Sequence, residues 1–251
     1  MYCRLMSSGS VLTTPHSTWI GDTAVTAYVQ LYHDDNSSYR YGELLTRVVD
    51  GPGIETFLEQ LPPDGHRDLL EWQLMLKEEF TALTGHRLSI NIHNKLIDDE
   101  RRRQSFVELL ARFPTVCTIE FTETHPMPPV LDANRLLRSV RELGFETALD
   151  DFGTGLNGMS LLTDYDFSII KVDRSLIFDI DTRVEKRKTV ALIRKMLAVL
   201  SKKHVVEGVE TTDLHQRLRR LGFSVFQGYG FHRPTPIGDV IEQLSTVEEA
   251  S

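Results

Sequence analysis

The sequence predicts an α/β fold of the modified TIM (β/α)8 barrel type, in which the first strand is antiparallel to the others. From about residue 85 onward, short runs rich in Val, Ile and Phe alternate with longer segments whose apolar residues recur at helical spacing. Gly85, Gly144 and Gly222 each follow a helical segment and precede a strand, as C-terminal glycines do. Eight strands in about 230 residues are typical of a closed barrel.

The first two strands, 24–31 and 39–49, flank the polar segment 33–38 and are predicted to pair as a hairpin. The later strands are predicted at 88–92, 116–121, 147–149, 167–172, 204–206 and 224–226. Helices are predicted at 104–113, 131–143, 184–200, 213–221 and around 237–244. The hairpin makes the first barrel strand antiparallel.

An open doubly wound sheet is the structural alternative. The sequence lacks the Gly-rich fingerprint of a dinucleotide-binding sheet, so the barrel is favoured. We assign the barrel to residues 23–251. Residues 1–22 have no clear period and are expected to be a loose N-terminal arm, too short for a sensor or partner domain.

Composition excludes several classes of protein. The 251 residues carry 28 Lys and Arg against 36 Asp and Glu, a net charge of -8, which argues against a protein that coats duplex nucleic acid. No apolar stretch is long enough to span a membrane, and the N-terminus does not resemble a secretion signal. Cys3 and Cys117 lack the spacing of a metal or redox motif. A cytoplasmic protein with reduced thiols is expected.

Three consecutive arginines, Arg101, Arg102 and Arg103, follow Asp98, Asp99 and Glu100 at the start of a predicted helix. We interpret this segment as a solvated helix face whose charges pair with one another. A phosphate site is the less favoured alternative.

Acidic and amide side chains, together with one lysine, recur at the carboxyl ends of the predicted strands, where a barrel builds its active site. They are Glu43, Asn91, Glu120, Asp150, Asp151, Lys171, Asp173, Glu207 and Gln227. Any one carboxylate could merely cap the next helix. Several carboxylates in one barrel mouth repel one another unless cations neutralise them. Oxygen ligands select hard ions, so two Mg²⁺ or Mn²⁺ ions that assist displacement at a phosphate are predicted.

Asp150 and Asp151 are consecutive, and consecutive residues on a regular strand point to opposite faces. Both can reach one site only if the strand breaks there, and Gly153 and Gly155 supply such a break. Lys171 and Asp173 would share a face of a regular strand. A lysine among carboxylates is expected to stay charged and to orient a water or a phosphate oxygen.

Seven ordered motifs extend from about residue 25 to about residue 240. They are 43–47 (ELLTR), Asn91, 119–123 (IEFTE), 150–155 (DDFGTG), 171–173 (KVD), 207–211 (EGVET) and 227–229 (QGY). In this order they resemble the EAL-type cyclic di-GMP phosphodiesterases. The sequence departs from that family at Leu44, which replaces the signature Ala, and at 156–159, next to the family's dimer contact.

The resemblance implies that the chain hydrolyses cyclic di-GMP to linear pGpG with two Mg²⁺ or Mn²⁺ ions, and so lowers this bacterial second messenger. By position, the implied metal ligands are Glu43, Asn91, Glu120, Asp150, Asp151 and Glu207. Glu207 is also the implied general base, Lys171 and Asp173 would position the water, and Glu123 would brace the 150–155 loop. The implied substrate contacts are Arg47, Leu45, Gln227 and Glu210. A homodimer is implied as well.

Two other hypotheses stay open. A catalytically weak or inactive member of the family would act as a cyclic di-GMP receptor or a protein-binding regulator, although the complete set of metal-competent residues argues against this. A metal-dependent barrel enzyme for another phosphoester would need the same residues, and spacing alone does not exclude it.

Overall fold

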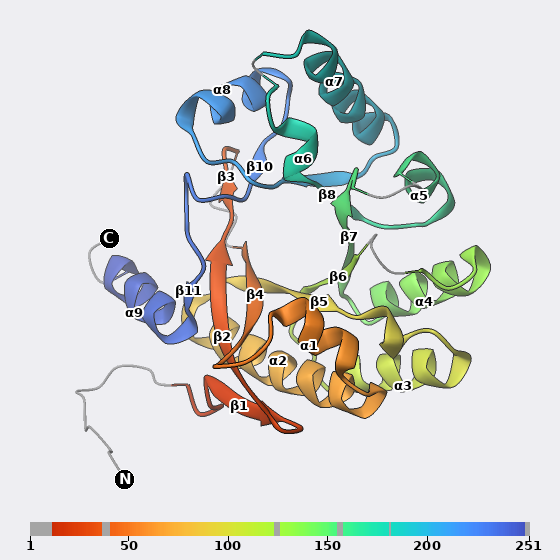
Figure 1. Ribbon diagram of the computed structural model, residues 1–251, viewed down its shortest axis with the longest axis vertical. Coiled ribbons are helices and arrows are strands. Elements are labelled where there is room, and N and C mark those ends of the chain that lie inside the picture. The colour runs from red at the N-terminus through yellow and green to blue at the C-terminus, as the bar shows by residue number, and fades with distance from the viewer. Residues whose placement is uncertain (1–11, 37–40, 123–125, 155–157, 181, 249–251) are drawn as a thin grey trace.

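The strands close into a barrel that is surrounded by helices (Figure 1). The computed structural model describes residues 12–36, 41–122, 126–154, 158–180 and 182–248. Seven neighbouring parallel strands form most of the wall: β4 (Tyr41–Val48), β5 (Arg87–Ile92), β6 (Thr118–Thr122), β7 (Glu146–Phe152), β8 (Ile169–Val172), β9 (Lys203–Val206) and β10 (Val225–Phe226), as counted over these described ranges. The fold is the modified TIM barrel that the sequence predicts.

The antiparallel first strand is confirmed. Strand β2 (Thr23–Leu31) pairs with β4 from Val25 opposite Val48 to Leu31 opposite Gly42. After Tyr32 the chain continues as β3 (His33–Asp34), which pairs antiparallel with β10 and closes the ring. The predicted polar turn at 33–38 is therefore wrong at its first two residues. The partner of β3 comes from the other end of the chain, and no local pattern reveals it.

Helices cover the outside of the barrel. They are α1 (Ile54–Gln60), α2 (Pro63–Thr84), η1 (Asn94–Leu96), α3 (Glu100–Leu110), α4 (Val130–Glu142), α5 (Gly158–Asp164), α6 (Arg174–Ile177), α7 (Val184–Val199), α8 (Thr212–Arg220) and α9 (Ile237–Glu248). The five helices predicted by range correspond to α3, α4, α7, α8 and α9. Helix α2 ends at Gly85, whose φ of 66° is left-handed, as expected for a C-terminal glycine.

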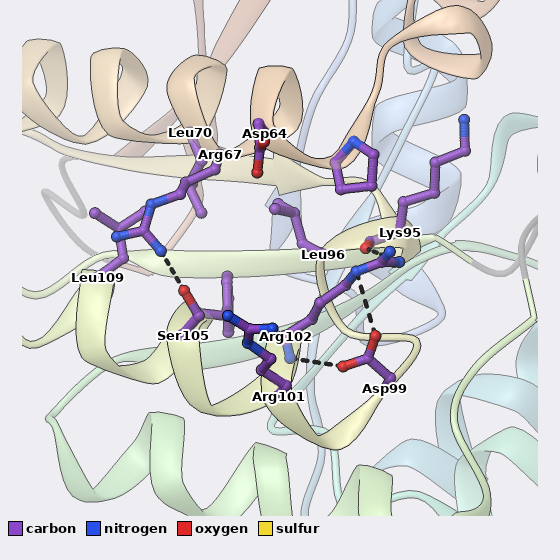
Figure 2. Close-up of a pocket in the computed structure, with 12 residues that line it drawn as sticks. Asp64, Arg67, Leu70, Lys95, Leu96, Asp99, Arg101, Arg102, Ser105 and Leu109 are labelled. Atoms are coloured by element: carbon purple, nitrogen blue, oxygen red, sulfur yellow. Dashed lines mark hydrogen bonds and ion pairs between the residues drawn. The ribbon is translucent and has the colours of Figure 1, made fainter.

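The arginine-rich segment lies on this outer layer, beside a pocket of about 500 Å³ between α2 and α3 (Figure 2). Arg102 pairs with Asp98 at 2.6 Å and with Asp99 at 3.3 Å, and Arg103 approaches Asp132 at 3.5 Å. These charges neutralise one another. At Arg102 and Arg103 the structure therefore supports a paired helix face rather than a phosphate site.

Part of the N-terminal segment packs on the barrel, although its sequence shows no clear period. Ser17–Ile20 forms β1, which pairs antiparallel with the start of β2. Just before it, the carboxylate of Glu79 accepts hydrogen bonds from the backbone N–H groups of Thr13 and Thr14 at 2.7 and 3.0 Å. Residues 17–20 therefore form a strand where a loose arm was expected. Residues 1–11 lie outside the described part of the chain.

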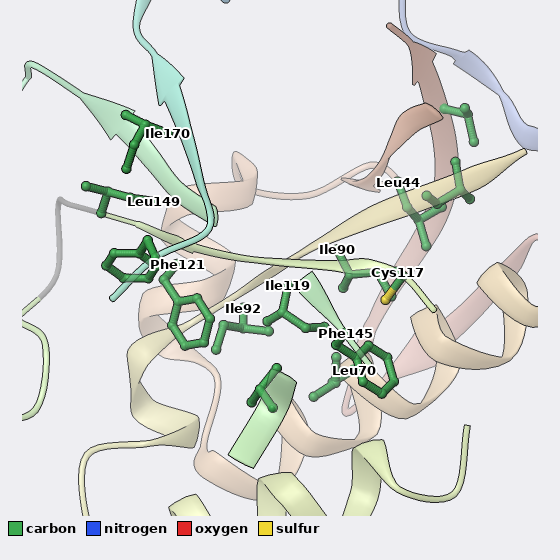
Figure 3. Close-up of a cluster of buried hydrophobic side chains, with 14 of the residues drawn as sticks. Leu44, Leu70, Ile90, Ile92, Cys117, Ile119, Phe121, Phe145, Leu149 and Ile170 are labelled. Carbon is green, nitrogen blue, oxygen red and sulfur yellow. The ribbon is translucent and has the colours of Figure 1, made fainter. Parts of the chain in front are cut away.

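Alternation along the strands separates the apolar core from the barrel interior. Leu44, Ile90, Ile119, Leu149 and Ile170 are buried in the layer between strands and helices (Figure 3). Successive strand residues point to opposite faces, so the adjacent positions face inward. These inward positions carry Glu43, Asn91, Glu120, Asp150 and Lys171. The same hydrophobic pattern that packs the helices thus places polar side chains inside the barrel.

Candidate active site at the carboxyl ends of the strands

Strand β7 breaks at the Asp150-Asp151 pair, as predicted. The register between β7 and β8 shifts between Leu149 and Phe152, and Asp151 has a φ of 56°. This left-handed conformation is costly for a residue other than glycine, and such strain is concentrated at functional sites. Carboxylate oxygens of Asp150, Asp151 and Glu207 consequently lie within 4.8 Å of one another.

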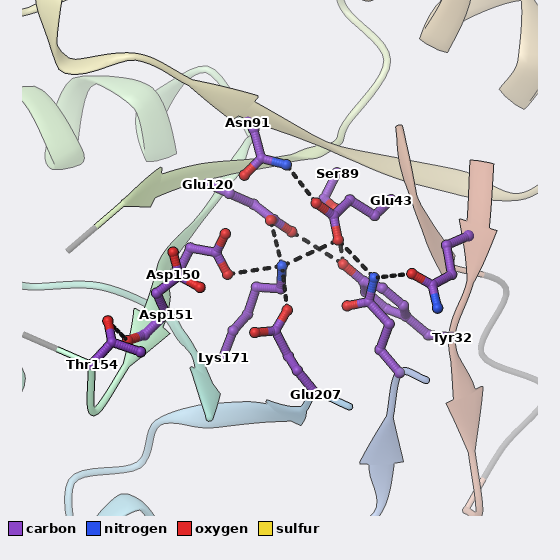
Figure 4. A network of polar contacts seen from close by, with 12 residues as sticks. Tyr32, Glu43, Ser89, Asn91, Glu120, Asp150, Asp151, Thr154, Lys171 and Glu207 are labelled. Atoms are coloured by element: carbon purple, nitrogen blue, oxygen red, sulfur yellow. Dashed lines mark hydrogen bonds and ion pairs between the residues drawn. The ribbon is translucent and has the colours of Figure 1, made fainter. Parts of the chain in front are cut away.

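Lys171 lies at the centre of the site (Figure 4). Its Nζ atom is 2.7 Å from Glu120 Oε2, 2.8 Å from Glu207 Oε1, 2.9 Å from Asp150 Oδ1 and 3.2 Å from Glu43 Oε2. We refer to these four acidic residues as the mouth carboxylates. They come from β4, β6 and β7 and from the residue after β9, and one ammonium group neutralises only part of their charge.

Amide groups hold Glu43 in place. Asn91 Nδ2 donates to Glu43 Oε1 at 2.5 Å, and Gln227 Nε2 donates to Glu43 Oε2 at 2.7 Å. Gln227 also donates to Gln30, which lies opposite Glu43 in the pairing of β2 with β4. The structure therefore brings Asn91 and Gln227, both predicted from sequence, directly onto a mouth carboxylate.

The mouth carboxylates differ in pKa because their surroundings differ. Burial raises the pKa of Glu120 to about 8, although Lys171 opposes this shift. Burial and the neighbouring carboxylates also raise the pKa values of Asp150 and Glu207. Burial would raise the pKa of Glu43 too, but Lys171 and the two amides lower it below its ordinary value.

The pKa values of Asp151 and Lys171 are also shifted by burial and by neighbouring charges. Burial and the charge of Asp150 raise the pKa of Asp151 to about 6. Burial acts to lower the pKa of Lys171, but Asp150 and the other mouth carboxylates raise it well above its ordinary value. This raised pKa favours the charged form of Lys171, and the surplus negative charge favours binding of further cations.

Three residues of the network were not predicted from the sequence: Gln30, Tyr32 and Ser89. The hydroxyl of Tyr32 donates to Glu120 Oε1 at 3.1 Å and lies 3.0 Å from the hydroxyl of Ser89. Gln30 donates to the carbonyl of His232 at 2.9 Å. The available signal was Gln30 near the end of β2 and Tyr32 just after it, because extended residues two positions apart share a face.

Other predicted residues lie around the site rather than in it. Asp173 accepts a hydrogen bond from the backbone N–H of Ser175 at 2.7 Å and caps α6, although its charge also contributes to the raised pKa of Asp151. Glu210 forms an ion pair with Arg174 at 2.9 Å. Glu123 lies outside the described residues.

The guanidinium of Arg47 stacks on the ring of Tyr28, 4.6 Å from its centroid, on the exposed end of β4. Leu45 lines a groove of about 570 Å³ that reaches Asn91, Asp150 and Asp151. The groove runs from the mouth carboxylates toward α1 and α2 and is large enough for a small-molecule ligand.

The donor set fits hard divalent cations. Carboxylate oxygens dominate it, the amide of Asn91 adjoins it, and its surplus negative charge requires compensation. Glu43, Asn91, Glu120, Asp150, Asp151 and Glu207 are the residues positioned to hold such ions. Thiol and imidazole groups are absent from this set of six residues, all of which the structure describes.

The family model of the EAL domain matches residues 24–234, which is most of the chain. The chain belongs to the EAL domain family. This EAL domain is 31% identical over 178 residues to the cyclic di-GMP phosphodiesterase RocR of Pseudomonas aeruginosa, covering 67% of this chain and 45% of RocR. It is 29% identical over 168 residues to the cyclic di-GMP phosphodiesterase PdeB of Shewanella oneidensis, covering 64% of this chain and 19% of PdeB. The chain thus spans less than half the length of these relatives.

Solved structures share the fold. An EAL domain protein from Listeria monocytogenes superposes with a TM-score of 0.77 at 23% identity, covering 88% of this chain and 93% of that protein. Klebsiella pneumoniae BlrP1, solved with manganese and cyclic di-GMP, has a TM-score of 0.73 at 28% identity, with 85% of this chain and 57% of BlrP1 covered. Across its described residues, this EAL domain has no helix with the length and apolar character needed to cross a bilayer.

Proposed function

We propose that this EAL domain is a cyclic di-GMP phosphodiesterase that hydrolyses one phosphodiester bond and releases linear pGpG. The observation that carries the proposal is the convergence of the mouth carboxylates, Asp151 and Lys171 at the carboxyl ends of the strands, next to a groove of about 570 Å³. The named relatives RocR and PdeB, and BlrP1 with its bound manganese and cyclic di-GMP, support the choice of substrate.

The reaction adds one water to one phosphorus atom. The water oxygen forms a new bond to phosphorus, the bond from phosphorus to the ribose 3′ oxygen breaks, and that oxygen takes up a proton. The ring opens into a linear dinucleotide with a 5′ phosphate and a 3′ hydroxyl. The protein must therefore accept a proton from water, position the water, and stabilise negative charge on the phosphate.

We assign the metal ions to Glu43, Asn91, Glu120, Asp150, Asp151 and Glu207. Two Mg²⁺ or Mn²⁺ ions would supply electrophilic assistance at the phosphate and lower the pKa of the attacking water. The surplus of mouth carboxylates over cationic side chains supports this assignment. Nearby positive charge also keeps buried carboxylates ionised.

Glu207 is the general base in this proposal. Its carboxylate follows β9, 2.8 Å from Lys171, and lies within 4.8 Å of Asp150 and Asp151, which line the groove. Lys171 orients that water or a phosphate oxygen. Asp173 and Glu123 are assigned supporting roles in positioning the water and bracing the loop.

The substrate is assigned to the groove and its rim. Leu45 lines the groove, Arg47 offers an exposed guanidinium that can pair with a phosphate, and Gln227 and Glu210 complete the outer part. Loss of a contact that binds the substrate and the transition state equally would raise the Michaelis constant and leave the turnover number unchanged.

We also propose that the EAL domain assembles as a homodimer. Helix α7 exposes Leu192 and Val199, at 64% and 83%, and Phe178 lies exposed just before it. Apolar surface of this kind suits contact with a second copy. Light scattering after gel filtration distinguishes a dimer from a monomer.

Product analysis tests the proposed function. Purified protein is incubated with cyclic di-GMP and Mg²⁺ or Mn²⁺, with EDTA, Glu43→Ala and Asp150→Ala as negative controls and the remote variant Asp98→Ala as a matched control. We expect metal-dependent pGpG from the parent and from Asp98→Ala alone. Saturable binding of cyclic di-GMP with no product would instead assign the chain to the receptors.

A further inference from the structure

We propose that His33, Asp35 and His215 form a second cation site, separate from the mouth carboxylates, which takes a borderline transition-metal ion such as Zn²⁺. We refer to these three residues as the seam cluster, because they lie beside the pairing of β3 with β10 that closes the barrel. The inference concerns structure and does not depend on the reaction proposed above.

The seam is one of the short pairings in the described part of the wall. Strands β3 and β10 pair only through Val225 opposite Asp34 and Phe226 opposite His33, with one more hydrogen bond from Asp35 N–H to the carbonyl of Ser224 at 2.9 Å. Few backbone hydrogen bonds hold the barrel closed there. An ion that links the β3 segment to α8 would therefore add stability beside this short pairing.

The side chains of His33 and His215 converge on the carboxylate of Asp35. His33 Nε2 lies 3.0 Å from Asp35 Oδ1, and His215 Nε2 lies 3.1 Å from each carboxylate oxygen. His33 and Asp35 belong to the β3 segment, whereas His215 belongs to α8, which lies near β3 and β10 in Figure 1. One donor atom from each residue lies within 4.8 Å of the others.

Aromatic packing fixes both imidazole rings. The ring of His33 stacks on Phe231 with 4.3 Å between centroids and an interplanar angle of 5°. The ring of His215 lies edge-on to Phe226 at 4.7 Å and to Phe231 at 4.9 Å. The rings therefore present their Nε2 atoms to Asp35 without rearrangement, which reduces the entropy lost on metal binding.

A further contact orients the carboxylate. Arg219 Nε lies 2.8 Å from Asp35 Oδ2, whereas Oδ1 faces His33. An ion bound through Oδ1 and the two Nε2 atoms would leave the contact between Arg219 and Oδ2 in place. Hydrogen bonds to the second oxygen of a ligating carboxylate are the usual support of a metal site.

The ligand types separate this site from the barrel mouth. Two imidazoles and one carboxylate select Zn²⁺, Co²⁺, Ni²⁺ or Cu²⁺, whereas carboxylate and amide oxygens select Mg²⁺ and Mn²⁺. Excess Mg²⁺ should therefore occupy the mouth and leave the seam cluster available. The two sites can thus be titrated independently.

Co²⁺ is the spectroscopic probe. The full chain, held in excess Mg²⁺, is titrated with Co²⁺ and then with Zn²⁺, and bound metal is counted by equilibrium dialysis. We expect one tightly bound Co²⁺ ion per chain, with the visible absorption bands of a nitrogen-ligated ion of low coordination number. Addition of Zn²⁺ should displace the Co²⁺ and abolish these bands. His33→Gln and His215→Gln, which keep side-chain size and a hydrogen-bond donor, should weaken this binding by about 100-fold or more.

The controls locate the ion. His16→Gln removes a histidine before β1 and should leave binding unchanged, and Asp150→Ala should do the same. Loss of the bands in Asp150→Ala would place the ion in the barrel mouth and overturn the proposal. Undiminished binding in His33→Gln and His215→Gln, or no tight equivalent in the parent, would also overturn it and leave a hydrogen-bonded cluster only.

Discussion

The Nζ atom of Lys171 lies 2.7 Å from Oε2 of Glu120 inside the barrel, and both side chains are only 1% exposed. A buried ion pair of this kind is stable only when further charges and hydrogen bonds surround it. Three more carboxylates approach Lys171, and Tyr32 donates to the second oxygen of Glu120. The pair is therefore the centre of a network, and substitutions within it should have large effects.

Lys171→Met should destabilise the protein by about 3–5 kcal/mol, because it leaves buried carboxylates without their cation. Thermal unfolding should shift down by roughly 10 °C, and Mg²⁺ should restore part of the loss. Lys203→Met is the matched control, because Lys203 is exposed and forms an ion pair with Glu146 at the surface. The melting temperature of this variant should stay close to that of the parent. Equal melting temperatures for the two variants would contradict this account.

Tyr32→Phe should weaken divalent metal binding by roughly 10–100-fold while the fold is retained. The substitution keeps the ring but removes the hydroxyl that orients Glu120 and approaches Ser89. Calorimetric titration with Mn²⁺ measures the effect. Tyr165→Phe is the control. It removes a hydroxyl that donates to the carbonyl of Pro128 at 3.4 Å and does not contact the mouth carboxylates, so the affinity for Mn²⁺ should stay unchanged.

Divalent metal should stabilise the protein through the mouth carboxylates. At a Mg²⁺ concentration 100 times the dissociation constant, the gain is about 2.7 kcal/mol, which raises the melting temperature by roughly 5–10 °C. EDTA should reverse this shift. Asp150→Ala should abolish most of it, and a full shift in that variant would show that the ion binds elsewhere.

Gly228→Ala should disrupt the contact between the segments that follow β9 and β10. A Cβ atom at Gly228 would lie 2.1 Å from the backbone oxygen of Val209, a contact that no side-chain rotation relieves. Displacement there would move both Glu207 and Gln227, so activity and thermal stability should fall together. Gly53→Ala, where a Cβ meets nothing within 4 Å, should change the melting temperature by only a degree or two.

The contribution of His204 to stability should fall as the pH drops from 7 to 5. Burial lowers the pKa of His204 to about 4, and its Nε2 accepts a hydrogen bond from Ser224 N–H at 3.1 Å. Its contribution is complete above the unfolded pKa of about 6.5 and declines as the pH falls toward 4, because only the unfolded chain takes up the proton readily.

The expected loss from His204 between pH 7 and pH 5 is about 1–2 kcal/mol. Urea unfolding of the parent and of His204→Gln at both pH values measures it, and subtraction removes the contributions of other titrating groups. The parent should lose more stability than the variant over this interval. Identical losses would show that His204 remains able to take up a proton in the folded chain.

The barrel could be predicted from the sequence because its strands and helices produce local, periodic patterns of apolar residues. Apolar runs at 88–92 and 204–206 and glycines such as Gly85 mark strands and helix ends wherever they occur in the chain. The same spacing predicted that Glu43, Glu120, Asp150 and Glu207 share one rim, because parallel strands end at the same face. The positions of the acidic residues were therefore accessible before the tertiary structure.

Contacts between distant segments were decided only by the tertiary structure. Tyr32 reaches Glu120 across 88 positions, and β3 pairs with β10. The seam cluster likewise unites residues 180 positions apart. The periodicity of the sequence predicts which face of its strand or helix a side chain occupies. Closure of the barrel decides which of these faces meet. Distances between those faces, and hence charges and pKa values, follow from packing rather than from sequence pattern.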